Sequence, residues 1–173
     1  MWILLGCIMV FIVLLLIVVL CIVSFIHNHQ TYFTLKKCLS DMEISEDMTE
    51  LIVPGNRCND EDITVLDFSR FTWLKKMKIG DGCFENVSEL KLIGLGELES
   101  VVIGKDSFLS SSGVFTLQRC DSLTELTIGH SSFGSYHEIV LGGVPVLETV
   151  SVGNKCFASS SLELKGENGC VVS

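Results

Sequence analysis

From residue 62 onward, apolar positions recur along the chain with a constant phase. Leucine, glycine and phenylalanine return together in the segments 74–84, 98–108, 123–133 and 147–157, at spacings of 24, 25 and 24 residues. The phased positions are Leu74, Leu98, Leu123 and Leu147; Gly80, Gly104, Gly129 and Gly153; and Phe84, Phe108, Phe133 and Phe157. A period of this length predicts a solenoid in which each repeat forms one coil.

Each repeat contains two short segments in which apolar and polar residues alternate. In residues 100–103, Val101 and Ile103 form the apolar set, and in residues 114–118 this set is Phe115 and Leu117. A period of two is typical of a strand with one face inward, so each coil should hold two strands. Stacked coils would pair these strands in parallel, about 4.8 Å apart, with the phased phenylalanines in one internal ladder. We expect the phased glycines to turn the chain with a positive φ.

The four segments read LKKMKIGDGCF, LESVVIGKDSF, LTELTIGHSSF and LETVSVGNKCF. Residues 62–170 thereby resemble the leucine-rich-repeat family, and within it the BspA-like repeats, in which an I-x-I-G strand precedes a short turn that ends in a buried phenylalanine. The resemblance implies a mainly β, leucine-rich-repeat solenoid of about four to five coils with parallel strands, covering residues 62–173.

Residues 1–26 contain no charged side chain. A helix of this length, rising about 1.5 Å per residue, exceeds the roughly 30 Å hydrocarbon core of a bilayer. We therefore expect one transmembrane α-helix before the solenoid and a single-pass membrane protein; the alternative is a cleaved signal peptide. Lys36 and Lys37 follow the apolar run, and this charge bias favours a cytoplasmic body over an extracellular one.

Residues 27–61 form an acidic juxtamembrane connector. Between positions 41 and 62 there are eight carboxylates and a single basic residue, Arg57. Its last part, TELIVPGNRC, has the apolar alternation and the Pro-Gly turn of an imperfect first repeat. The whole chain has a formal net charge of −9 and no basic patch, which argues against nucleic acid as a partner.

The cysteines follow the repeat more than they follow any metal motif. Cys83 and Cys156 stand directly before a phased phenylalanine, and Cys120 replaces an apolar residue, so we interpret all three as core residues. Cys38 and Cys58 are plausible disulfide partners if the body is extracellular. No C-x-x-C pair occurs, so we predict no metal site and no cofactor.

The sequence contains two candidate modification sites and no catalytic motif. Asn86 begins the N-glycosylation sequon Asn-Val-Ser in the turn that follows Phe84. Cys170 begins a C-terminal Cys-Val-Val-Ser of the kind that is prenylated in a cytosolic chain. Cys170 also falls on the register of the phased leucines, so the alternative is a core residue.

These patterns predict a membrane-anchored, non-catalytic protein-interaction module that contacts the membrane through residues 1–26 and a protein partner through the solenoid surface. The outward positions of the first strand of each repeat are mostly small or hydroxyl-bearing in the later coils. This composition suits a flat binding face, and it equally suits an exposed β-face that only has to stay soluble. The alternative is a secreted or cell-surface protein with a structural or adhesive role.

Overall fold

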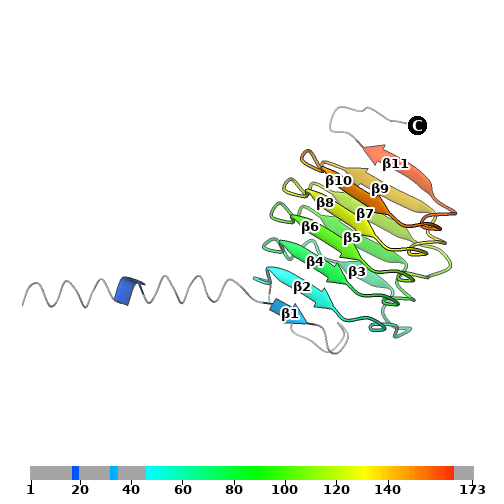
Figure 1. The fold of residues 1–173 in the computed structure, drawn as a ribbon, viewed down its shortest axis with the longest axis horizontal. Helices are drawn as coiled ribbons and strands as arrows, with labels where there is room; N and C mark the ends of the chain where they lie inside the picture. The colour runs from blue at the N-terminus through cyan, green and yellow to red at the C-terminus, as the bar shows by residue number, and fades with distance from the viewer. Residues whose placement is uncertain (1–16, 20–31, 35–45, 166–173) are drawn as a thin grey trace, which may run out of the picture. The chain divides into compact units, whose positions relative to one another are not determined.

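The computed structural model describes residues 17–19, 32–34 and 46–165, with the backbone alone for 32–34 and 161–165. Eleven strands of the described chain form two parallel sheets (Figure 1). Sheet A contains β1 (Tyr32–Thr34), β2 (Glu50–Val53), β4 (Lys76–Ile79), β6 (Ser100–Ile103), β8 (Glu125–Ile128) and β10 (Thr149–Val152). Sheet B contains β3 (Val65–Asp67), β5 (Glu89–Ile93), β7 (Val114–Gln118), β9 (Glu138–Gly142) and β11 (Ser161–Lys165).

From β2 onward the chain alternates between the two sheets, so that one strand of each makes one coil. Every strand pairs in parallel with its counterpart in the next coil, in the register that the repeat spacing predicts: Lys76 pairs with Ser100, and Ser100 with Glu125. The prediction of a mainly β solenoid with two parallel strands per coil is confirmed. β2, which lies in the acidic connector, pairs with β4 and belongs to the first coil.

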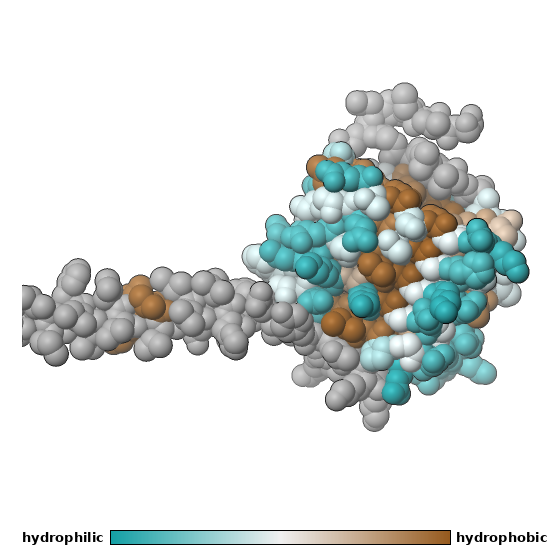
Figure 2. All heavy atoms as spheres, viewed as in Figure 1, coloured by the Kyte–Doolittle hydropathy of each residue, from teal (hydrophilic) through white to brown (hydrophobic). Residues whose placement is uncertain are grey.

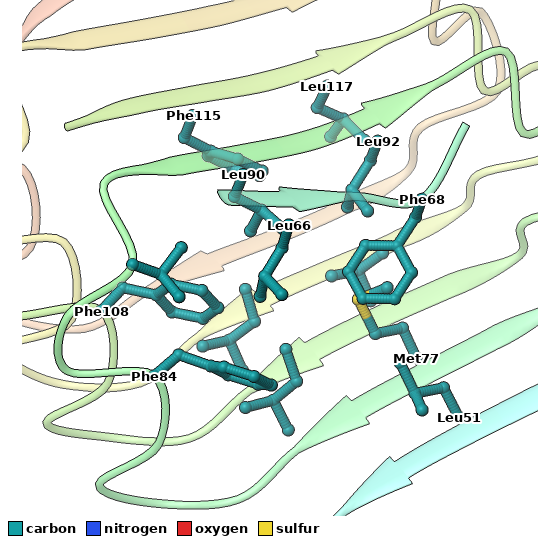
Figure 3. Packing of buried hydrophobic residues seen from close by; sticks show 14 of the residues in the cluster. Leu51, Leu66, Phe68, Met77, Phe84, Leu90, Leu92, Phe108, Phe115 and Leu117 are labelled. Carbon is teal, nitrogen blue, oxygen red and sulfur yellow. The ribbon is translucent and has the colours of Figure 1, made fainter. Parts of the chain in front are cut away.

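The core lies between the two sheets and consists of the inward residues of both. Along β4, β6 and β8 every second residue is buried, which matches the alternation in the sequence. The phenylalanines form the predicted ladder: ring centroids are 5.3 Å apart between Phe84 and Phe108, 4.6 Å between Phe108 and Phe133, and 5.2 Å between Phe133 and Phe157. Figure 3 shows Phe84 and Phe108 facing the leucines of sheet B across this core.

The phased glycines do not have the positive φ that we expected. Positive φ falls instead two and four residues after each of them, as at Asp106 (54°) and Phe108 (58°) in the coil of Gly104. All four ladder phenylalanines have the left-handed backbone conformation, with φ values of 59°, 58°, 57° and 53° along the ladder. This conformation is unfavourable for a bulky residue, so burial of the stacked rings has to offset its cost.

The glycines are needed because consecutive coils approach closely at this corner. A Cβ at Gly104 would lie 2.5 Å from the carbonyl carbon of Gly80, and one at Gly129 would lie 2.4 Å from the carbonyl carbon of Gly104. Both atoms belong to the backbone of the preceding coil, which is held by strand pairing and cannot move aside. Glycine therefore provides room between coils here, and other residues provide the turn.

The expected transmembrane helix over residues 1–26 is contradicted. Of that stretch the structure describes residues 17–19, which are helical. None of the helices in the described residues is long and apolar enough to cross a bilayer. The inferred membrane localisation with a cytoplasmic body is wrong on the same ground. The other residues of 1–26, together with Lys36 and Lys37, lie outside the described residues.

A glycine-to-alanine pair tests the close approach of the coils. Gly104→Ala should lower the free energy of unfolding by about 1 to 3 kcal/mol, because the added methyl group would overlap backbone that cannot move aside. Gly96→Ala is the control: no atom lies within 4 Å of a Cβ there, so stability should be unchanged or raised by up to about 1 kcal/mol. Urea unfolding followed by circular dichroism measures both; equal effects would contradict the packing role of Gly104.

Candidate interaction surface

The outer face of sheet A, which we call the A face, consists of two rows of outward side chains. Strand pairing aligns Glu50, Lys76, Ser100, Glu125 and Thr149 in one row and Ile52, Lys78, Val102, Thr127 and Ser151 in the other. Figure 2 shows apolar and neutral residues over the middle of this face and hydrophilic residues to either side. The A face is thus a shallow, ordered array with a spacing of about 4.8 Å between strands.

Hydrogen bonds fix the polar groups in the middle of the A face. Ser100 Oγ donates to one carboxylate oxygen of Glu125 at 3.0 Å, and Thr127 Oγ1 donates to the other at 3.3 Å. Two strands away, Lys76 and Lys78 are exposed on β4. The face therefore presents separate positive and negative positions, with the half-exposed Val102 between them.

The outer face of sheet B differs because its charged groups pair with each other. Lys91 Nζ lies 2.8 Å from Glu89 Oε1, and the hydrogen bond that Lys91 donates to this carboxylate raises the pKa of Lys91. Hydrogen bonds from Ser69 lower the pKa of Asp67, whose carboxylate accepts the Ser69 N–H at 2.9 Å. These internal pairs leave sheet B with fewer uncommitted charges for a partner than the A face has.

A ladder of side-chain hydrogen bonds ties consecutive coils together beside the phenylalanines. Ser107 Oγ donates to the Gly80 carbonyl at 3.1 Å and accepts the Cys83 N–H at 3.2 Å, both in the preceding coil. Ser132 repeats this arrangement one coil later, with the Gly104 carbonyl at 2.7 Å and the Ser107 N–H at 3.1 Å. The thiols of Cys83 and Cys156 donate hydrogen bonds to the carbonyls of Pro54 and Gly129, respectively. Sequence reasoning had treated these positions as simple core residues.

Two of the three free thiols in the described residues, Cys83 and Cys120, are poorly suited to chemistry. Cys83 and Cys120 are fully buried, and burial raises the pKa of both, that of Cys120 to about 11. At neutral pH neither forms a significant fraction of the reactive thiolate. Cys156 is a free thiol and half-buried, whereas Cys58 is disulfide-bonded. Cys38, the partner that we expected for Cys58, lies outside the described residues.

Asn86 lies in the turn between Phe84 and β5, as the sequence predicted. It is half-buried, and its Nδ2 donates to the Asn59 carbonyl at 2.7 Å. The hydroxyl of Ser88, which completes the sequon, donates to the Thr64 carbonyl at 3.2 Å. Glycosylation of Asn86 stays a prediction, and Cys170 lies outside the described residues.

Within the part of the chain that the structure describes, no group of three or more His, Cys, Asp or Glu side chains could hold a metal ion. No protein-family model matches the chain, and the searches for similar curated proteins and solved structures found no match. The resemblance to leucine-rich repeats therefore remains a prediction from the sequence, and the structure supports the coarser class of parallel β-solenoid.

The hydrogen-bond ladder can be tested at Ser107. Ser107→Ala removes one partner from the Gly80 carbonyl and one from the Cys83 N–H, so unfolding should become easier by about 1 to 3 kcal/mol. Ser107→Cys should cost clearly less, because a thiol already donates to the corresponding carbonyl from Cys83 and Cys156. Thermal unfolding of both variants provides the comparison, and a cysteine variant as unstable as the alanine variant would count against the ladder.

Proposed function

We propose that this protein is a non-catalytic protein-interaction module that binds another protein through the A face. One observation carries the proposal: strand pairing holds two aligned rows of side chains in fixed positions on an outer sheet surface, and all of them from β6 onward except Glu125 are short. A partner can approach such a face closely, and little side-chain entropy is lost when short residues become ordered on binding.

The charges of the A face would give the contact its orientation. Lys76 and Lys78 lie on β4, and the carboxylate of Glu125 on β8 is held by two hydroxyl groups. A partner with an acidic group opposite β4 and a donor opposite Glu125 would bind in one register, because the reverse arrangement places like charges together. Val102, between them, would be the apolar contact at the centre of the interface.

The second candidate function is that of a secreted or cell-surface structural or adhesive repeat protein. The disulfide at Cys58 favours it, because disulfides persist in oxidising compartments and are rare in the cytosol. The sequon at Asn86 would be modified only along the same route. Both candidates use the solenoid as a surface without catalysis, and the second adds that the chain passes through an oxidising, secretory compartment.

Two threonines provide a matched test of the A face. Thr127 lies on sheet A and Thr116 on sheet B; both point outward and are half-buried. With the full chain in its native cells, chemical cross-linking and mass spectrometry should identify a protein whose yield falls about tenfold in Thr127→Lys, equivalent to about 1.4 kcal/mol of binding. The same protein should be retained by Thr116→Lys. If no cross-linked protein distinguishes the two variants, the A face is not the binding surface.

The compartment can be tested at the sequon without changing Asn86. In a secretory protein, an endoglycosidase-sensitive mass increase should be present in the natural chain and in Ser88→Thr, which keeps the sequon, and absent in Ser88→Ala. Intact mass of the protein from eukaryotic cells measures it. Identical, unmodified masses for all three would remove glycosylation as support for the second candidate.

A further inference from the structure

The two ends of the solenoid differ in how well their core residues are covered. In the first coil the inward residues Leu51 and Val53 are 0% and 1% exposed. In the last coil the inward residues Val150 and Val152, which pair with Leu126 and Ile128, are 56% and 47% exposed. The same structural position is therefore core at one end and surface at the other.

The open end also contains an apolar hollow. A cavity of about 250 Å³ lies between the last strands, lined by eight apolar side chains and Ser160. Val150, Val152, Leu141 and Phe157 are among the lining residues, and they are all more exposed than their counterparts in the preceding coils. Exposed apolar surface of this kind is typical of an interface.

β10 lacks the charges and the proline that commonly prevent an edge strand from pairing. It is the last strand of sheet A in the described chain, and its sequence is Thr-Val-Ser-Val. Natural edge strands are commonly protected by lysine, proline, a bulge or an inward charge. β10 contains no charge and no proline, and all its residues except Ser151 are β-branched and favour strands.

We infer that β10 pairs with β10 of a second copy of this chain, in antiparallel orientation, about a two-fold axis at Ser151. This register places Val150 opposite Val152 of the second copy on the inward face, where directly opposed side chains contact each other. It joins the apolar ends of the two cores and continues sheet A from one copy into the other.

Charge and symmetry both favour a second copy. In this register Glu148 lies opposite Asn154 of the second copy and beside its Lys155. Glu148 and Lys155 have opposite charges, and the two-fold axis repeats this attractive pair. In a head-to-tail stack, β10 would have to pair with the first coil of the next copy. That edge of β2 is already paired with β1, and the inward residues of the first coil are already buried. The contact is thus between like ends and closes as a dimer.

Site-specific cross-linking of the full chain tests this pairing. With a short bismaleimide, Ser151→Cys should give about tenfold more covalent dimer than the unsubstituted chain or Lys78→Cys. Two cysteines at the axis would have Cβ atoms about 5 Å apart. Lys78 lies on β4, three strands from β10, so its copies would be separated by about 30 Å.

A second substitution shows whether the dimer uses the β10 edge. Val150→Lys, added to Ser151→Cys, should abolish the cross-link because it opposes a charge to Val152 of the second copy. Val150 is 56% exposed in the single chain, so the substitution should leave the fold of the single chain intact, as circular dichroism would show. A cross-link at Ser151→Cys no stronger than at Lys78→Cys, or one that survives Val150→Lys, overturns the proposal. A cross-link that appears only after residues 166–173 are removed also overturns it and assigns the open end to that segment.

Discussion

The close approach of consecutive backbones at the glycine corner is the constraint on which the rest of the structure depends. A Cβ at Gly80, Gly104, Gly129 or Gly153 would lie within 2.5 Å of backbone in the preceding coil. The carbonyls of the first three then accept hydrogen bonds from the Ser or Cys side chain of the next coil. With the corner fixed in this way, the strands on both sheets stay in register, and the phenylalanine rings stack directly beside it.

The repeat spacing predicts the strands and the phenylalanine ladder well, because burial alternates along a strand and the same alternation is visible in the sequence. It does not predict what the glycines do. A residue required for a positive φ and one required for a close contact both appear as glycine, and only the position of the neighbouring coil distinguishes them. The left-handed residues two positions after the glycines are chemically varied, namely Gly82, Asp106, Ser131 and Lys155, so they leave no common signal. The four left-handed phenylalanines do recur, but their periodicity indicates burial and carries no sign of their φ.

The hydrogen-bond ladder did leave a signal that hydrophobic reasoning missed. The position before each ladder phenylalanine is occupied by Cys83, Ser107, Ser132 and Cys156, all small side chains that can donate a hydrogen bond.

For residues 1–26, the prediction of a transmembrane helix failed for a different reason. An uninterrupted apolar run indicates a preference for transfer out of water, which is not in itself evidence for a long helix. Residues 17–19 are the part of this run that the structure describes, and none of the helices among the described residues could cross a bilayer.

The A face and the open end are surfaces of different origin. On the A face, one row contains a cation at Lys78, an apolar residue at Val102 and hydroxyl groups at Thr127 and Ser151. These residues can differ because outward side chains do not hold the coils together. At the open end, Val150 and Val152 continue the inward pattern of β8, and they are exposed only because no described strand lies beyond β10. Pairing between two β10 strands would run within the plane of sheet A and would leave its outward rows uncovered. The fold can therefore bury the exposed inward residues of its last coil in a dimer and still present the A face to a different protein.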